Sequence, residues 1–381
     1  MNKPLFVAAV IARLPLATFT IGVLVHVQHL TGSYGAAGAA SGALAIAQGV
    51  GGPALGKLVD RRGQTQVLIG TAAVAAAALG ALAALPAGVP LGVVLALAAT
   101  LGAATPPVAA CLRTLIPVLF PDSVRRTYAV DTAATELTWV AGPPLALGVG
   151  SIWGSSVSLA AAGFVLIGAT TIFALSPASR NWRPAATGRS AAGALASPAM
   201  RTLVAVMVGV GALFGAAEVA VTAAAAGLGH IAAAGSLFGL WGVGSLLGGI
   251  VAARRGGGAN SGRGFAALLA LLGLGHVALG GATGSIVLLA VVVTAAGTMI
   301  APVLTSAYAM VDGAAPPGTV TEAFAWLATA SAVGASIGAT AGGLTADAAG
   351  PAAAFVMAGG AALAAATVAA LAVPARVPVT A

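Results

Sequence analysis

The sequence predicts an all-α membrane protein that crosses a bilayer many times. Of its 381 residues 59% are hydrophobic and only 6% are charged, and the mean hydropathy is +1.05. A soluble globular chain carries about 25% charged residues, so this composition cannot cover a water-facing surface. Successive apolar runs are each long enough, at more than about 18 residues, to cross a bilayer core as a helix. The runs lack the period-two alternation of membrane β-strands, which leaves helices as the predicted spans.

Twelve helices are predicted, with the N-terminus inside. Fifteen of the sixteen Lys and Arg residues then lie in inner segments, and the remaining one, Arg13, lies near the inner end of the first helix. This bias of positive charge toward the cytoplasm supports the count and the orientation, and it predicts an inner (plasma) membrane protein with both termini cytoplasmic. It also accounts for the net charge of +8 without nucleic-acid binding. The predicted ranges are 4–30, 36–57, 65–86, 89–112, 126–150, 154–175, 202–226, 232–252, 264–282, 285–310, 319–344 and 350–373.

The two halves of the chain are predicted to be copies of each other. Arg61-Arg62-Gly63 recurs as Arg254-Arg255-Gly256 after 193 residues, Pro107 matches Pro302 after 195, and Gly142 matches Gly338 after 196. Two six-helix bundles related by an axis along the membrane normal are expected to surround a central cavity, with the binding site near the midplane. The predicted division is a bundle over 1–176, a polar cytoplasmic linker over 177–200 and a bundle over 201–381.

A charged string, Gly56–Gly63, separates two long apolar runs. Its acid, Asp60, lies next to the cytoplasmic face, where an anion can stabilise the positive N-terminus of a helix that enters from that side. The plainer alternative is a solvated loop whose charges only fix the topology. The second-half copy has Ala253 in place of the acid, so a contact of this kind should be asymmetric.

The charged string resembles the loop signature of the major facilitator superfamily at Gly56, Leu58, Asp60, Arg61 and Gly63, and departs from it at Gln64, where that family often has a basic residue. The resemblance covers the whole chain. It implies a twelve-helix transporter in which this loop meets the start of the eleventh helix, near Thr319, and switches between inward-open and outward-open states. The residues that it assigns to the conformational switch are Gly56, Asp60, Arg61, Arg62 and Gly63.

Two further features bear on the direction of transport. Gly142 and Pro143 in the fifth helix resemble part of the Gly-Pro motif of the family's exporters, although the motif's further glycines are incomplete. The fourth-helix Arg that is typical of drug/proton antiporters is absent from the membrane-embedded part, and Arg113 lies at the inner end instead. The first feature favours efflux.

Two carboxylates within the predicted spans are candidates for proton or substrate binding. An ionised side chain in the hydrocarbon costs about 2.5–3.5 kcal/mol on insertion scales, so each needs a reason. Glu136 is expected near the midplane in the fifth helix and Glu218 in the outer half of the seventh. The alternative role for both is a protonated, hydrogen-bonded contact between helices.

Four other residues are candidates for the cavity wall. Asp131, Thr135 and Trp139 share one face of the fifth helix by their i, i+4 spacing, and Trp139 offers a surface for an aromatic or cationic substrate. The other role expected for Asp131 is an ion pair with Arg113 or with Arg126. Arg13 reaches either the inner surface or the cavity.

The remaining motifs point to structural roles or to none. Thr319-x-x-Glu322 fits a capping box at the start of the eleventh helix. Cys111 is alone and the four His are scattered, so no metal site or cofactor is predicted. No nucleotide-binding or intramembrane-enzyme motif occurs, so the protein is predicted not to be an enzyme.

The expected function is therefore secondary transport by alternating access, as proton-coupled export of a small drug-like or metabolite compound. The expected partners are that small-molecule substrate, protons as the coupling ion and the lipid bilayer, with no nucleic acid and the protein as a monomer. Import or facilitated diffusion of a metabolite is the main alternative, and a membrane sensor or scaffold without transport is a remote one.

Overall fold

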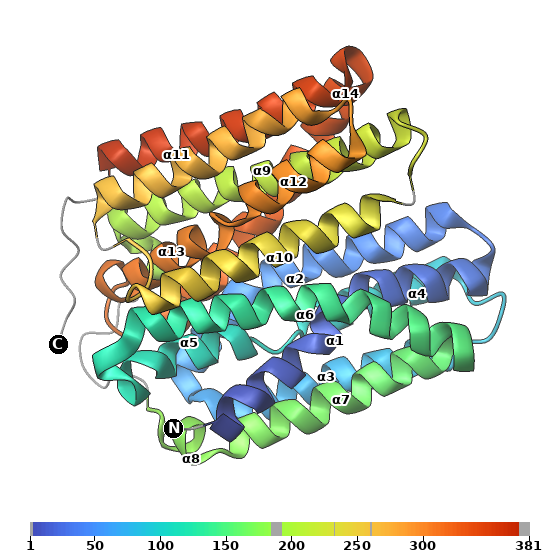
Figure 1. The fold of residues 1–381 in the computed structure, drawn as a ribbon. Coiled ribbons are helices and arrows are strands. Elements are labelled where there is room, and N and C mark those ends of the chain that lie inside the picture. Colours follow the sequence, from blue (N-terminus) through green and yellow to red (C-terminus); the bar gives the residue numbers. More distant parts are fainter. Residues whose placement is uncertain (1–2, 184–192, 232, 260, 373–381) are drawn as a thin grey trace. The chain divides into compact units, whose positions relative to one another are not determined.

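A computed structural model describes residues 3–183, 193–231, 233–259 and 261–372 (Figure 1). Some side chains inside these ranges, in α6 above all, lie outside the description. Over the described residues the secondary structure is helical, which confirms the predicted all-α class. The chain divides into two compact units, and each unit contains a segment from the opposite half of the sequence.

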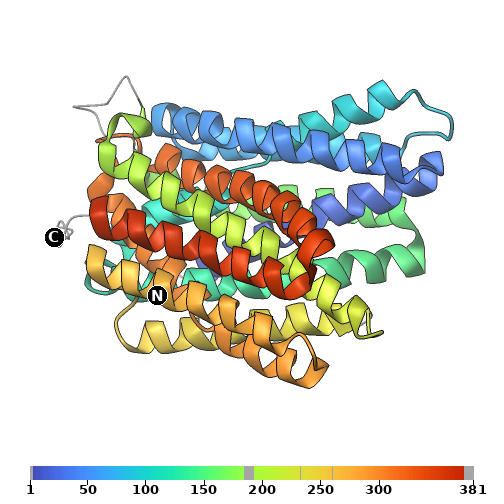
Figure 2. The same ribbon diagram turned by 90° about the horizontal axis from the view of Figure 1, so that it is seen from above.

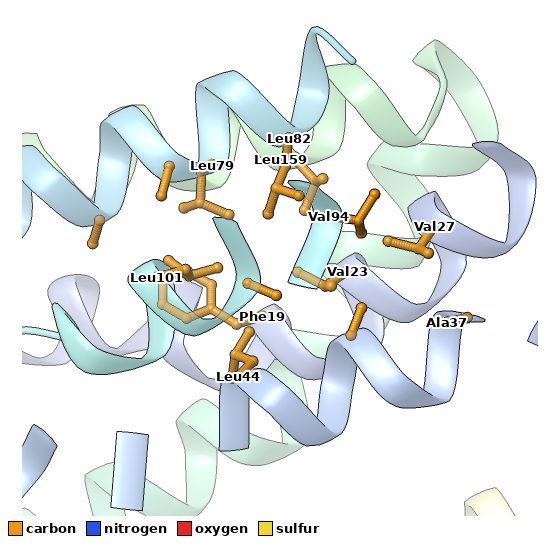
Figure 3. Close-up of a cluster of buried hydrophobic side chains, with 14 of the residues drawn as sticks. Phe19, Val23, Val27, Ala37, Leu44, Leu79, Leu82, Val94, Leu101 and Leu159 are labelled. Atoms are coloured by element: carbon orange, nitrogen blue, oxygen red, sulfur yellow. The ribbon is translucent and has the colours of Figure 1, made fainter. Parts of the chain in front are cut away.

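Unit 1 comprises Met1–Leu119, Leu137–Gly193 and Pro317–Ala325. Its core lies where the helices α1, α2, α3, α4 and α7 meet, around Phe19, Leu44, Leu79, Leu101 and Leu159 (Figure 3). In Figure 1, α3 and α7 run side by side. The helices of this unit are α1 (Lys3–Thr31), α2 (Tyr34–Arg62), α3 (Gln64–Ala83), α4 (Leu91–Ala103), α5 (Val108–Leu119), the later part of α6 (Val124–Trp153), α7 (Ser155–Leu175), α8 (Pro177–Asn181) and the first turn of α14 (Val320–Ala372).

Unit 2 comprises Phe120–Glu136, Ala194–Pro316 and Trp326–Ala381. The helix α14 breaks at Gly350, whose φ of 81° and ψ of 171° are not helical, and α9 lies between its two parts (Figure 2). The elements of this unit are η1 (Pro121–Ser123), the start of α6, η2 (Ala194–Ala196), α9 (Pro198–Gly227), α10 (Ala233–Arg254), α11 (Gly262–Leu279), η3 (Gly280–Ala282), α12 (Ile286–Gly297), α13 (Ile300–Ala314) and the rest of α14.

Each of the twelve predicted ranges contains helical structure, but two of them are interrupted. The predicted fourth helix, 89–112, is divided into α4 and α5, because the prolines at Thr105-Pro106-Pro107 interrupt the helix. The second of these helices continues beyond the predicted end, to Leu119. The predicted tenth helix, 285–310, is divided into α12 and α13 at Thr298 and Met299. The predicted outer loop 345–349 is helical up to the break at Gly350. Among the described residues nine stretches are long and apolar enough to cross a membrane, and α14 counts as one of them despite its break.

Close glycine packing repeats in both units at the spacing of the duplication. A Cβ on Gly51 of α2 would lie 2.7 Å from the carbonyl oxygen of Ala103 at the end of α4. In unit 2, a Cβ on Gly244 of α10 would collide with the carbonyl of Thr294 on α12. Gly51 and Gly244 are 193 residues apart, the offset of the charged repeat. Small residues let helix backbones approach in lipid, where apolar burial does not drive helix association.

The pairing of α9 with α14 depends on the same device. A Cβ on Gly211 or Gly215 of α9 would collide with the carbonyl of Ser331 or Ala335 on α14. In the other direction, Gly338 of α14 lies against the backbone of Ala212. The glycines recur every four residues on each helix, as expected for one continuous contact face.

We predict that Gly338→Ala lowers the thermal stability of the purified protein in detergent. The new methyl group meets the backbone of Ala212 rather than a movable side chain, and overpacking of this kind costs about 1–3 kcal/mol. The melting temperature checks the prediction.

Gly343→Ala on the same helix is the matched control, because a Cβ there meets nothing within 4 Å. Ala is favoured over Gly in a helix by about 0.5–1 kcal/mol, so this variant should melt at or slightly above the temperature of the unmodified protein. Equal melting temperatures for the two variants would contradict the packing argument.

Candidate functional site

The charged string lies almost entirely in the last two turns of α2, not in a loop as the sequence predicts. The helix continues through Arg62, and Gly63 alone separates it from α3. Gly63 has a φ of 91°, a conformation that residues with a Cβ rarely adopt, and its N–H donates to the carbonyl of Val59 at 2.8 Å. The glycine therefore lets α2 turn directly into α3, and it holds the charged end of α2 in a fixed direction.

Asp60 is buried, with 3% of its surface exposed, and caps the start of α14. The backbone N–H of Thr321 donates to its Oδ1 at 3.2 Å, and the N–H of Glu322 donates to its Oδ2 at 2.8 Å. The first amides of a helix have no partner within the helix and carry its positive dipole end. A carboxylate that accepts two of them is therefore stabilised by hydrogen bonding and by the dipole together.

Gly56 makes this contact sterically feasible. It lies one turn before Asp60 on the same face of α2. A Cβ there would lie 2.8 Å from the Cα of Glu322 and 2.9 Å from the carbonyl oxygen of Thr321. A larger residue would separate the two backbones, and the carboxylate of Asp60 would lose its amides.

Glu322 has a contact that the predicted capping box does not include. Its backbone amide donates to Asp60 on another helix, and the capping box with Thr319 stays a prediction. The Glu322 side chain, 7% exposed, extends toward Gly193, where a Cβ would lie 2.5 Å from its Oε1. Gly193, which ends the second segment of unit 1, thus lies against the same turn of α14 that Asp60 caps.

A second contact holds the same turn of α14. The guanidinium carbon of Arg113 on α5 lies 6.0 Å from the ring centroid of Phe324, and both side chains are buried. This geometry is a cation–π interaction. The sequence expectation for Arg113 was an ion pair with Asp131, which belongs to unit 2, and that pairing stays a prediction.

Gln64, the departure from the family signature, is a buried connector. Its Nε2 donates to the carbonyl of Cys111 at 3.1 Å and to Oγ1 of Thr114 at 2.9 Å, while its Oε1 accepts from the hydroxyl of Ser179 at 3.0 Å. It is 1% exposed. A basic side chain has no acceptor for Ser179, so the carboxamide suits a site that joins α3, α5 and α8.

Arg61 and Arg62 are exposed, and neither guanidinium has a hydrogen bond or ion pair with any residue that the structure describes. Their exposure agrees with a role in topology rather than in the contact. Within the charged string, the contact with α14 therefore comes from Gly56 and Asp60, and the turn into α3 from Gly63.

The other candidate residues are divided between the two units, and each is described within its own unit. Arg13 is buried in α1, where its Nε donates to the carbonyl of Ala9 at 3.0 Å, and not at the surface. Asp131 is fully buried at the start of α6, and Thr135 donates to its carbonyl at 2.9 Å. Glu218 lies on an exposed face of α9.

Some candidates have only part of their structure described. Gly142 is buried in α6, but the side chains of Glu136, Trp139 and Pro143 in that helix lie outside the described part. Their roles stay predictions.

The sequence reasoning missed one contact. The hydroxyl of Tyr128 on α6 donates to Oδ2 of Asp312 on α13 at 3.1 Å. The sequence places Asp312 at the inner surface of the membrane, where a charged side chain is solvated and therefore does not indicate a function. A comparison of each Asp and Glu with the matching position in the other half of the chain is the signal that could have identified it.

Burial raises the pKa of the Asp60 carboxyl from 3.8 to about 6, and the hydrogen bonds from Thr321 and Glu322 oppose this rise. The nearby charge of Glu322 adds a smaller increase. Asp60 lies beyond the apolar range 36–57 that is predicted to cross the membrane. The titratable groups that interact with it are Glu322 on α14 and Cys111 on α5.

We predict that Asp60→Asn loosens the first turn of α14. Asn keeps the shape, but its amide nitrogen cannot accept the second backbone N–H, and a hydrogen bond to a charged group contributes about 1.5–3 kcal/mol. Hydrogen exchange of the amides after Thr321 should accelerate by about 10- to 100-fold. Asp122→Asn, which removes an exposed acid in η1, is the control, and equal exchange in both variants would refute the capping role.

We also predict that the contact strengthens on acidification. The pKa of Asp60 in the contact, about 6, exceeds its ordinary value of 3.8, so the contact binds a proton more tightly than the released carboxyl does. By linkage the contact gains stability as the pH falls from about 7.5 to about 5, and loses it as the pH rises through the bound-state pKa. Protection factors for the start of α14, corrected for intrinsic exchange rates, measure this.

The variant Asp60→Asn has no titrating group at this position, so its protection factors should not follow the same pH dependence. Protection that falls on acidification of the unmodified protein would reverse the predicted sign.

Several solved structures resemble this protein over nearly its whole length. The human organic anion transporter MFSD10 (TETRAN) matches with a TM-score of 0.72 and 16% sequence identity, over 96% of this chain and 98% of that one. A bacterial homologue of the iron transporter ferroportin, in an outward-facing state with soaked iron, matches with a TM-score of 0.72 and 15% identity, over 98% of both chains. The same kind of homologue in an outward-facing state matches at 0.70 and 14% identity, over 97% of both.

No protein-family profile matches the sequence, and no curated protein matches it either. The structural matches nevertheless extend over nearly the full length of each chain. The protein therefore has the fold of the major facilitator superfamily, built from multiple apolar helices of membrane-spanning length.

Proposed function

We propose that the protein is a secondary active transporter that works by alternating access and exports a small drug-like or metabolite compound in exchange for protons. The observation that carries the proposal is the division of α14. Its first turn belongs to unit 1, where Asp60 and Gly56 hold it, and the rest of the helix belongs to unit 2. Two reversible hydrogen bonds thus decide whether that turn stays with unit 1.

A contact of this kind gives a transporter two discrete states. With Asp60 bound to the amides of α14, the turn is fixed, and with the contact broken the turn is free to move with the rest of its helix. Alternating access requires such a two-state element, because the two bundles rock about a site that stays near the midplane. We therefore propose that Gly56 and Asp60 form a gate. Arg61 and Arg62 are proposed to fix the orientation of the helices in the membrane.

Proton coupling is proposed to use Glu218 and Glu136. Glu218 is an exposed residue on a helix of membrane-spanning length, and its carboxylate has no hydrogen bond or ion pair to any described residue. Exposure of a carboxylate to lipid is costly, so we propose that it faces a water-filled cavity, where it takes up and releases a proton. The proposed cavity wall also includes Arg13, Asp131, Thr135 and Trp139.

The alternative is import or facilitated diffusion of a metabolite by the same fold. The incomplete Gly-Pro motif at Gly142 and Pro143 supports export. The structural neighbours include a transporter of organic anions and a homologue of an iron transporter, and both classes belong in the substrate panel of a test. We further propose an inner-membrane monomer with cytoplasmic termini and bundles at 1–176 and 201–381 joined by a linker at 177–200.

The test is flux through purified protein in liposomes, with an imposed pH gradient and a panel of dyes, antibiotics, organic anions, amino acids and iron. We predict that a substrate moves against its gradient and that collapse of the proton gradient stops the movement. Substrate flux that ignores the proton gradient would favour facilitated diffusion, and no flux of any compound would favour the sensor or scaffold.

For coupling itself, we predict that Glu136→Gln and Glu218→Gln each reduce gradient-driven flux by about 10-fold or more while counterflow of the substrate continues, because Gln cannot exchange a proton at neutral pH. Asp347→Asn, which removes an exposed acid from α14, is the control. If both Gln variants keep full gradient-driven flux, proton coupling through these residues is wrong.

A further inference from the structure

The start of α6 is held in unit 2 by a buried hydrogen bond. Tyr128 has no exposed surface, and its hydroxyl donates to Oδ2 of Asp312, 3.1 Å away in the last turn of α13. Asp312 itself is half-buried. A carboxylate that accepts from a buried phenol forms one of the stronger classes of hydrogen bond, because its charge assists the bond.

The loop after α10 contacts the same part of α6. Gly257 in this loop has a φ of 104°, and a Cβ there would lie 2.8 Å from the carbonyl carbon of Arg125. The loop is tied to α13 in turn, since the N–H of Ala259 donates to Oγ of Ser306 at 2.8 Å. The helix α13 therefore supports the start of α6 twice, directly through Asp312 and indirectly through Ser306.

This arrangement corresponds to the Asp60 contact in the duplicated chain. Gly249 is 193 residues after Gly56 and, like it, permits a close approach: a Cβ there would lie 3.2 Å from the Cβ of Ala133 on α6. The acid is missing, because Ala253 stands 193 residues after Asp60. The second half thus keeps the glycine-mediated approach of α10 to α6 and has lost the carboxylate on α10.

We propose that Asp312 and Tyr128 replace the lost acid and form a second gate, which holds the start of α6 in unit 2 as Asp60 holds the start of α14 in unit 1. The proposal rests on the alternating-access function. Each gate helix is then divided between the two units, and each of its first turns is held by one carboxylate. Asp312 and Tyr128 are positioning residues, and they do not touch the substrate.

The two gates differ in chemistry. Asp60 accepts two backbone amides, so no side chain of α14 is needed for its contact, whereas Asp312 depends on one hydroxyl group. Tyr128→Phe removes that oxygen, and with it the bond to Asp312, while the buried ring stays in place. The second gate is therefore the one that a single conservative substitution can open.

The test is hydrogen exchange of Tyr128→Phe and Asp312→Ala in the full-length protein, because neither variant retains the bond between the hydroxyl and the carboxylate. We expect the amides of the first turns of α6 to exchange about 10- to 100-fold faster in both variants, while the amides at the start of α14 keep their rate. The double variant should match the single ones, because both remove the same bond. Asp347→Asn, which deletes an exposed acid in the middle of α14, should change neither segment.

Three outcomes would overturn the proposal: exchange at α6 like that of the unmodified protein, equal acceleration at α6 and α14, or additive effects in the double variant. A gating role also requires a change in flux, so faster exchange at α6 with unchanged flux, in liposomes where Asp60→Asn does change it, would refute the gate. If no variant and no compound gives any flux, transport itself is wrong. The exchange result would still decide whether the bond anchors α6.

Discussion

The contact between the Asp60 carboxylate and the first amides of α14 is the interaction on which the functional interpretation depends. It joins a turn near residue 60 to a turn near residue 321, within one compact unit. Burial raises the pKa of the carboxyl, and the amides and the helix dipole stabilise its charged form. Burial has the larger effect, so the pKa in the contact is about 6 and the contact depends on pH near neutrality.

The contact is feasible only because Gly56 has no side chain. Glycines permit close approach of helix backbones elsewhere in the molecule as well. The approach of α2 to α4 at Gly51, and that of α10 to α12 at Gly244, place backbone against backbone. In lipid, helices gain little from burying apolar surface against each other, so contact of this kind is what holds them together. The richness in glycine, which a base-composition bias could also produce, therefore has a structural use at these positions.

The candidate site was predictable where a short pattern contains the whole contact, and not where the partner comes from a distant segment. The acid and glycine of the charged string, and the start of the eleventh helix as their partner, follow from the pattern and the family resemblance. The capping box at Thr319 and Glu322 stays a prediction, and it did not include the carboxylate from α2 that accepts the amide of Glu322. Asp312 was missed because its partner, Tyr128, lies 184 residues away.

The sequence by itself determined the helical membrane class and the approximate ranges of the helices, and it predicted the duplication, because hydropathy, charge bias and repeat spacing are properties of the linear chain. Only the tertiary structure decided in which compact unit the start of each helix packs. The starts of α6 and α14 belong to the units opposite to their own halves of the sequence. The charged string predicted how Asp60 would bind, but the position of Asp312 opposite Tyr128 exists only in the folded chain, because hydrogen bonds between side chains depend on distance in space and leave no spacing in the sequence.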